Sequence, residues 1–379
     1  MRTAKIFIRT LAAVFVILAA VQIVPAAHAC DLPPQIDDFR SAIPDDVAEY
    51  LPDGFFSDDA AELADAVRRT SGGEYIINTA LRIIGGGIGD AVRLFSTLSG
   101  IALAAALLFT VCGAEHKKSG GVVGLMVNAA AAVAVAGIQY PCLYSVVTYF
   151  ERQRVIMGAL LPLMGVLYAM GGNSGGAVLN NSTVLLWLEL IGVFSTAVLK
   201  PAVSVMIALS LAGAFLPSLR TSGLSAFVGK AVGTVLGLSA VLLGTALGAQ
   251  SVLTASGDRL GFRTAKFVAG SMIPVVGSTV GDSLRTLAAS VGMLRSTVGT
   301  AGIVVMILLL LPTLLSLLMA RLAFSASAGV AEMLGSGDMA RLYREMSSVW
   351  GLLIAAAALS ALIFVFSLTV FALTSAAIS

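Results

Sequence analysis

The stretch Thr297–Met319, TVGTAGIVVMILLLLPTLLSLLM, contains no charged residue. As a helix it would be about 35 Å long, enough to cross a hydrocarbon core of about 30 Å. Similar apolar runs recur along the chain, in which 58% of residues are hydrophobic and 12% are charged, whereas soluble domains carry about 25% charged residues. Short alternating segments typical of membrane β-barrels do not stand out. We therefore expect an all-α, polytopic integral membrane protein.

Eight apolar runs are candidates for transmembrane helices. The third is short, and the fourth and fifth meet at Lys200-Pro201, so we expect about six to eight spans. The runs are Leu94–Cys112, Val122–Val147, Val155–Met170, Thr183–Leu199, Ala202–Leu216, Phe227–Leu253, Thr297–Met319 and Val349–Leu373.

The first 29 residues have the layout of a secretory signal peptide. Three basic residues precede the apolar run Leu11–Val24, and Ala27-His28-Ala29 follows it. Cleavage after Ala29 would make Cys30 the first mature residue, which raises the possibility of lipid attachment. However, Ala27 stands where a lipid-attachment motif normally has Leu. We therefore expect residues 1–29 to be an ordinary signal peptide, with an uncleaved first membrane anchor as the alternative.

Residues 30–93 form an acidic segment with thirteen acidic and five basic residues, a net charge of −8. The rest of the mature chain, residues 94–379, has a net charge of +7 and is expected to form the multi-span membrane domain. Because basic residues are retained on the cytoplasmic side, the acidic segment is expected to be extracytoplasmic. Its helical apolar spacing favours short amphipathic helices rather than a folded domain.

An interrupted apolar run follows a cluster of charges at residues 258–266. The run Phe267–Val280 would be about 21 Å long as a helix, which is short for a span. Pro274 breaks it, which favours a re-entrant or broken helix inside the protein. A helix on the membrane surface, anchored by basic residues, is the alternative. The candidate assembly or pathway residues are Arg263, Lys266, Phe267, Pro274, Gly277 and Asp282.

Polar side chains inside expected spans are a second set of candidates, because charges at membrane depth are costly. Glu189 either lines a polar interior or satisfies a hydroxyl of a neighbouring helix. Lys200 lies on nearly the same helix face, but about 16 Å away along the axis. Asn128 and Gln139 are expected to form hydrogen bonds between helices rather than to bind a ligand.

Glycines recur at intervals of four and seven residues in the sixth expected span. The set is Gly229, Gly233, Gly237, Gly244 and Gly248. Such a stripe lets helices approach closely in a membrane. The partner helix belongs either to this chain or to another subunit, so a homo-oligomer is one alternative.

Four strings imitate motifs of hydrolases, but none has the partners that catalysis needs. GNSG (Gly172–Gly175) and GDSL (Gly281–Leu284) lack a nearby histidine, since the chain has only His28 and His116. GIGD (Gly87–Asp90) and GSGD (Gly335–Asp338) place their aspartates outside the expected spans. The sequence has no GxxxxGK[ST] phosphate-binding loop. We expect no catalytic residues, no metal, no cofactor and no nucleic-acid partner.

Several stretches together resemble the stage III sporulation protein AE family of endospore-forming bacteria. The most specific are RTAKF (Arg263–Phe267) and IPVVG (Ile273–Gly277), followed by SVGMLRSTVGTAGIVVM (Ser290–Met306) and FSLTVFALTSA (Phe366–Ala376). Weaker likeness extends through ALLPLM (Ala159–Met164) and GGNSGG (Gly171–Gly176). The resemblance covers the chain from about residue 90 to its end.

The resemblance implies a membrane protein made in the mother cell and placed around the engulfed forespore. Its implied partners are the other stage III proteins, including a secretion-type ATPase and ring-forming subunits. With them it would build a channel, or feeding tube, that sustains the forespore. The family supplies no catalytic residue. Two alternatives remain open: a self-sufficient secondary permease, which would show inverted repeats, and a membrane scaffold without a pore.

Overall fold

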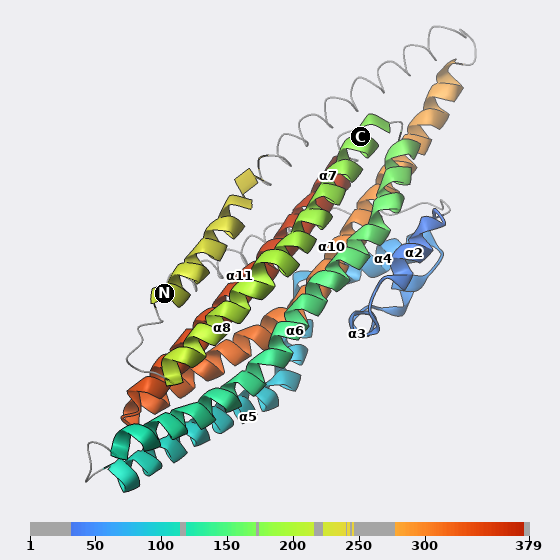
Figure 1. Cartoon of the computed structure of the whole chain (residues 1–379). Coiled ribbons are helices and arrows are strands. Elements are labelled where there is room, and N and C mark those ends of the chain that lie inside the picture. The colour runs from blue at the N-terminus through green and yellow to red at the C-terminus, as the bar shows by residue number, and fades with distance from the viewer. Residues whose placement is uncertain are drawn as a thin grey trace.

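The computed structural model describes residues 32–113, 119–171, 174–215, 223–239, 241–242, 245 and 277–374. Every regular element of this part is helical. Short helices lie at its N-terminal end, beside a bundle of long helices (Figure 1). The short ones are α2 (Gln35–Ser41), α3 (Asp45–Ala48), η1 (Asp53–Phe56) and α4 (Ala60–Thr70).

The long helices are α5 (Gly73–Gly113), α6 (Ser119–Met170), α7 (Ser174–Val193), α8 (Lys200–Phe215), α10 (Gly277–Met333) and α11 (Gly337–Thr374), and the π-helical turn η2 (Phe194–Leu199) joins α7 to α8. A shorter apolar helix spans Gly223–Ser239. Helices α6 and α10 contain 52 and 57 residues, which correspond to about 78 and 86 Å at 1.5 Å per residue. Each is more than twice as long as a hydrocarbon core of about 30 Å.

Helices α10 and α11 form the centre of the bundle as an antiparallel pair. A tight turn joins them, in which Gly335 has a φ of 78° that glycine adopts without strain. The amide of Ser336 donates to the carbonyl of Ala331, and that of Gly335 to Glu332, which caps the end of α10. At the other end of the pair, a Cβ on Gly299 would lie 2.8 Å from Ala372 Cβ. The two backbones therefore approach closely there.

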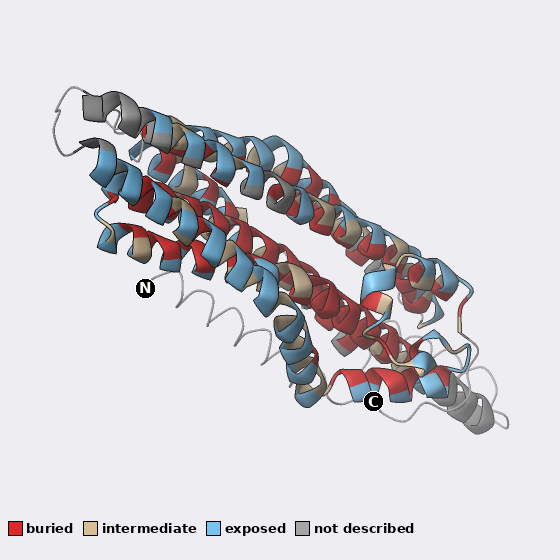
Figure 2. Cartoon of the chain, turned by 90° about the horizontal axis from the view of Figure 1, so that it is seen from below, coloured by how far each residue is buried: buried red, intermediate tan, exposed pale blue. Residues whose placement is uncertain are grey.

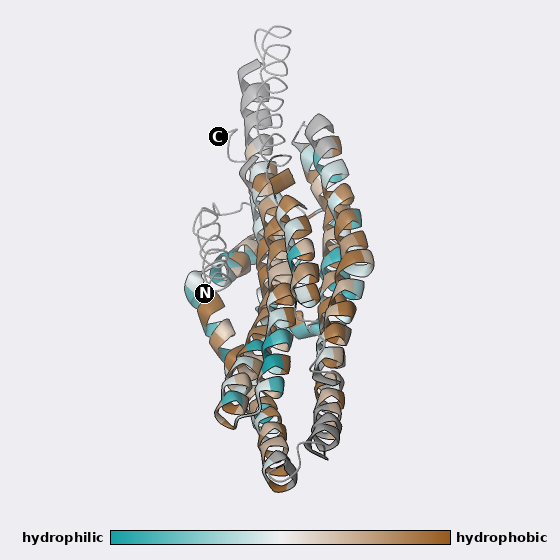
Figure 3. Cartoon of the chain, turned by 60° about the vertical axis from the view of Figure 1, so that its left-hand side comes forward, coloured by the Kyte–Doolittle hydropathy of each residue, from teal (hydrophilic) through white to brown (hydrophobic). Residues whose placement is uncertain are grey.

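The buried residues lie along the middle of the bundle, and exposed residues follow its outer faces (Figure 2). Trp350 and Tyr343 are among the largest fully buried side chains. The Phe324 ring lies 6.1 Å from Tyr343 and 6.2 Å from Trp350, between centroids. Hydrophobic residues recur along all the long helices, with hydrophilic ones between them (Figure 3).

Five helices of the described part are long and apolar enough to cross a membrane. These candidate spans are Gly73–Leu108, Leu143–Met170, Asn180–Gly213, Ala289–Met333 and Gly337–Ala372. The all-α membrane fold is therefore confirmed, and the last two expected spans, Thr297–Met319 and Val349–Leu373, lie within two of these candidates. Part of the sixth expected span, Phe227–Leu253, lies outside the described residues, as do the signal peptide and most of the interrupted run.

One expected separation between spans is wrong, and a second, left open at Lys200-Pro201, does not occur. The second and third expected spans belong to one helix, α6, because residues 148–154 contain neither glycine nor proline and continue the helix. The fourth and fifth are also continuous, from Ser174 through Phe215. Here Pro201 cannot donate to the carbonyl four residues earlier. The π-helical turn Phe194–Leu199 precedes it directly and widens the helix where that bond is missing.

The short helices α2, α3, η1 and α4 form a unit that we call the acidic cap (residues 32–70). Its apolar side chains Ile36, Phe39 and Phe55 are buried, and the cap packs against α6 and α10. Within the cap, Arg40 Nη1 donates to Asp58 Oδ1 at 2.7 Å. The side chain of Asp59 accepts from the amide of Ala61 and caps α4.

Candidate functional site: a polar strip across α6

Four consecutive polar residues, Glu151-Arg152-Gln153-Arg154, interrupt the apolar helix α6. They lie inside the candidate span Leu143–Met170. Because successive residues are 100° apart around a helix, each points in a different direction. Three of them meet partners on three other parts of the chain.

Arg152 points to the acidic cap. Its Nη1 donates to Asp46 Oδ2 at 2.7 Å, and both side chains are about half exposed. Exposed ion pairs of this kind contribute between 0 and about 1 kcal/mol. The pair therefore orients the cap on α6, while buried apolar contacts such as those of Phe39 and Phe55 hold it there.

Arg154 points to α7. Its Nη2 lies 3.7 Å from Glu189 Oε2, with 45% of the arginine and 75% of the glutamate side chain exposed. Gly192 makes room for the arginine, because a Cβ there would lie 2.8 Å from Arg154 Cζ. Beside the pair is an open groove of about 420 Å³, lined also by Glu151 and Leu185. The groove is therefore lined by two carboxylates and one guanidinium, of which Arg154 and Glu189 form the ion pair.

Gln153 points into the bundle, where it is fully buried. Its Nε2 donates to Tyr149 Oη at 3.3 Å, and Tyr149 Oη donates to the carbonyl of Ala357 on α11 at 3.2 Å. These bonds join α6 to α11 inside the bundle and satisfy polar groups that lipid could not.

We call Asp46, Arg152, Glu151, Arg154 and Glu189 the polar strip. At 100° per residue around α6, the side chain of Glu151 projects between those of Arg152 and Arg154, on the side of the helix opposite Gln153. In Figure 1, α6 lies between α7 and the short helices α2 and α3. The strip therefore crosses the outer face of α6 from the cap to α7. Sequence reasoning selected only Glu189 from it.

The other polar candidates do not gather around Glu189. Glu189 faces outward rather than into the bundle, and Lys200 is exposed at the start of α8. Asn128 and Gln139 lie on α6, and Asp282 lies in the first turns of α10, but their side chains are outside the described residues. Gly277 begins α10. Arg263, Lys266, Phe267 and Pro274 are outside the described residues altogether.

The glycine stripe is only partly used for packing within the chain. A Cβ on Gly229 would lie 3.2 Å from Met206 Cε on α8, whereas Gly233 and Gly237 have open space beside them. Gly244 and Gly248 lie outside the described residues. The internal contact expected for the stripe thus exists at one described glycine.

Sequence reasoning missed a buried arginine at one end of the bundle. Arg295 on α10 is 1% exposed, and its Cζ lies 4.1 Å from the ring centroid of Tyr168 on α6 and 5.5 Å from that of Phe371 on α11. A Cβ on Gly171 would lie 3.4 Å from its Nη1. Cation–π contacts thus join three helices. The available signal was a charge just before the most apolar run.

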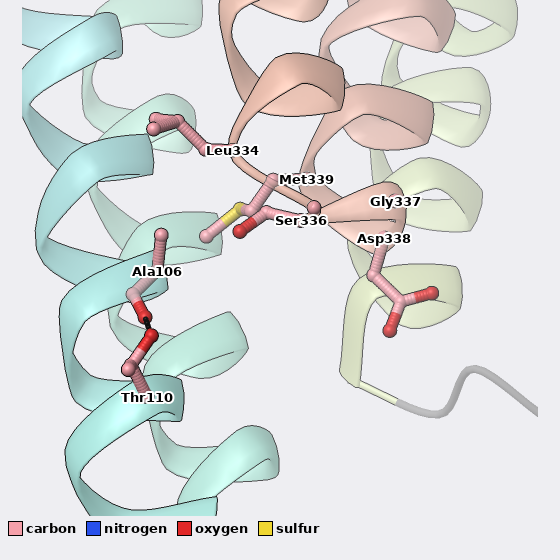
Figure 4. A pocket seen from close by; sticks show the side chains of 8 residues that line it. Ala106, Thr110, Leu334, Ser336, Gly337, Asp338 and Met339 are labelled. Atoms are coloured by element: carbon pink, nitrogen blue, oxygen red, sulfur yellow. Dashed lines mark hydrogen bonds between the residues drawn. The ribbon is translucent and has the colours of Figure 1, made fainter.

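The turn between α10 and α11 borders an open pocket of about 350 Å³ (Figure 4). Asp338 and Ser336 line it together with Thr110 of α5. The Thr110 hydroxyl donates to the carbonyl of Ala106 at 2.9 Å, so it is already engaged. Among the described residues, no group of three His, Cys, Asp or Glu side chains could hold a metal ion.

The long apolar helices and the buried polar contacts between them define the chain as a polytopic helical membrane protein. Its residues 69–375 match the family model "Stage III sporulation protein AE (spore_III_AE)". The chain therefore belongs to the stage III sporulation protein AE family, as the sequence resemblance predicted.

A protein of Bacillus subtilis (strain 168) named "Stage III sporulation protein AE" is 27% identical over 215 residues. The match covers 56% of this chain and 53% of that protein, so the chain spans about half the length of this relative. No solved structure matches the chain.

Proposed function

We propose that this chain is a non-enzymatic, integral component of a channel complex that links mother cell and forespore during sporulation. The membership of residues 69–375 in the stage III sporulation protein AE family carries this proposal. The five candidate spans support a place in a membrane. The proposed location is the mother-cell-derived membrane around the forespore. The proposed partners are the other stage III proteins, including a secretion-type ATPase and ring-forming subunits.

The test is a clean deletion of the gene in its source organism. We expect forespores to shrink or collapse after engulfment and heat-resistant spores to fall by orders of magnitude, with rescue by the wild-type gene. Normal forespores and normal spore numbers would contradict the proposal. The self-sufficient permease and the pore-free scaffold would then be tested by transport assays.

Two substitutions separate assembly from membrane insertion. Arg263→Ala combined with Lys266→Ala leaves every candidate span unchanged, so we expect normal insertion but reduced spore yield and reduced recovery of partner proteins. Wild-type spore yield would show that this motif is dispensable. Glu189→Leu tests the scaffold alternative, which requires no charge at this position and therefore predicts no functional loss.

A further inference from the structure

We propose that the polar strip lies in the extracytoplasmic headgroup layer of the bilayer. The strip divides the bundle into two parts. The bilayer core would surround the part that ends at the α5–α6 connection and the α10–α11 turn. The part towards Met170, with the acidic cap, would stand in water as a projection. This assignment does not depend on the channel function.

The first observation is the charge pattern of the strip itself. Across the outer face of α6 the charges alternate: Asp46, Arg152, Glu151, Arg154 and Glu189. The paired side chains are 41% to 75% exposed, so protein covers only part of each charge. Hydrocarbon disfavours such groups strongly, whereas phospholipid headgroups offer charges of both signs and water. A strip of alternating charges fits that layer.

The second observation is the acidic cap, which occupies one side of the strip. Its ten carboxylates are all exposed, and they are Asp37, Asp38, Asp45, Asp46, Glu49, Asp53, Asp58, Asp59, Glu62 and Asp65. The cap packs on α10 at Val298 and Ala301. Val298 is one turn from Arg295, which contacts Tyr168 near the end of α6. The cap therefore lies from the strip towards Met170 and gives that side a charged face, next to the exposed apolar side chains Val178, Leu185 and Leu186 of α7.

The third observation is the apolar surface on the other side of the strip. There α5 and α6 carry large exposed hydrophobic side chains, namely Ile88, Leu103, Leu107, Leu108, Val111, Met126, Val133 and Tyr144. Apolar side chains exposed over this length require lipid or protein to cover them, and the charged residues Asp90 and Arg93 of α5 are exposed between Ile88 and Leu103. From Arg152 to Ser119, α6 rises by about 50 Å, which is enough to cross the bilayer core with tilt.

The apolar residues of α10 and α11 do not conflict with this placement. In the most apolar window of each helix, 67% and 72% of residues are buried inside the bundle, against 17% for α5. Their hydrophobic character is therefore satisfied by protein contacts on both sides of the strip. Near the α10–α11 turn, Arg344 Nη1 donates to Glu332 Oε2 at 3.1 Å, and Arg341 Nη2 donates to the carbonyl of Gly213 at 3.1 Å. Basic residues at that end agree with a cytoplasmic location.

Cysteine accessibility tests the placement in the full-length protein. In a background with Cys30, Cys112 and Cys142 replaced by serine, single cysteines are introduced at Val178 and Tyr144. These positions are matched, since they are 67% and 71% exposed. Val178 lies eleven residues from Glu189 on α7, about 16 Å. Tyr144 lies eight residues from Arg152 in the opposite direction along the bundle, about 12 Å.

A charged, membrane-impermeant maleimide is added to right-side-out membrane vesicles. We expect V178C to react at least tenfold faster than Y144C, and E62C on the cap to react as fast as V178C. Full labelling of all three after denaturation in detergent shows equal reactivity, and identical elution of the folded variants in mild detergent shows that they fold.

Three results would overturn the placement. Protection of V178C to the level of Y144C would place the bilayer around the half of the bundle near Met170. Rapid reaction of Y144C would place water beside the expected lipid face. Reaction of a cysteine at Glu189 together with protection of V178C would show a water-filled path at membrane depth instead of a headgroup boundary.

Discussion

Replacement of Arg295 by Met tests whether the buried cation stabilises the bundle. Methionine has a similar length and is apolar, so the substitution removes the charge while largely filling the space. The guanidinium lies 4.1 Å from the Tyr168 ring centroid and 5.5 Å from that of Phe371. Both are within the roughly 6 Å range of cation–π attraction.

The expected magnitude follows from these two contacts. A cation–π contact contributes about 0.5–1 kcal/mol at exposed sites and about 2 kcal/mol when desolvated. Burial of the charge acts in the opposite direction, and replacing buried ionic groups by apolar ones is sometimes stabilising by about 1–4 kcal/mol. Because two rings enclose Arg295, we expect the attraction to prevail and Arg295→Met to lower the free energy of unfolding by about 1–2 kcal/mol.

The assay is reversible unfolding in mixed micelles, followed by tryptophan fluorescence. A double-mutant cycle with Tyr168→Leu isolates the contact between the two side chains, and we expect a coupling energy of about 1 kcal/mol or more. Arg295→Lys is the control, because it keeps the charge but cannot stack a planar group on the ring. A stability of Arg295→Met equal to or above wild type, with coupling near zero, would refute the reasoning.

Two further predictions concern glycines whose surroundings differ, and both are measured as unfolding free energies in the same micelles. Gly299→Ala should lower the free energy of unfolding by about 1–3 kcal/mol, since its Cβ would lie 2.8 Å from a Cβ on α11. Gly329 has open space beside it, so Gly329→Ala should raise the free energy of unfolding by up to about 1 kcal/mol. Gly229→Leu should lower the free energy of unfolding because the new side chain meets Met206 on α8, whereas Gly233→Leu should not lower it in the isolated chain. Equal losses of stability for the two variants would contradict the observed packing.

The sequence predicts the fold class well, because apolar runs in a chain with so few charges rarely form anything but membrane helices. It predicts helix boundaries poorly at three places. Residues 73–93 belong to the charged segment and yet form the first half of the continuous helix α5. The polar residues at 151–154 resemble a loop between spans, but partners on the cap, α7 and α11 let α6 continue through them. Pro201 does not end its helix, because a π-helical turn precedes it.

The candidate site was predictable only in part, because its components come from distant segments. A charge such as Glu189 inside an apolar run is visible in the sequence, but its partner Arg154 is not, since the two meet only through the packing of α6 on α7. Arg295 was overlooked for the same reason. Its aromatic partners, Tyr168 and Phe371, lie more than seventy residues away in either direction.

Hydrophobicity has two different causes in this chain, and the sequence does not distinguish them. The most apolar windows belong to α10 and α11, yet most residues of those windows are buried inside the bundle. Helix α5 is less apolar, but only 17% of its window is buried, so lipid or another protein must cover much of its surface. The bilayer position that we propose rests on the polar strip, the acidic cap and the exposed surface of α5 and α6. The longest apolar run, where hydropathy alone would centre the membrane, instead forms the interior on which the acidic cap packs.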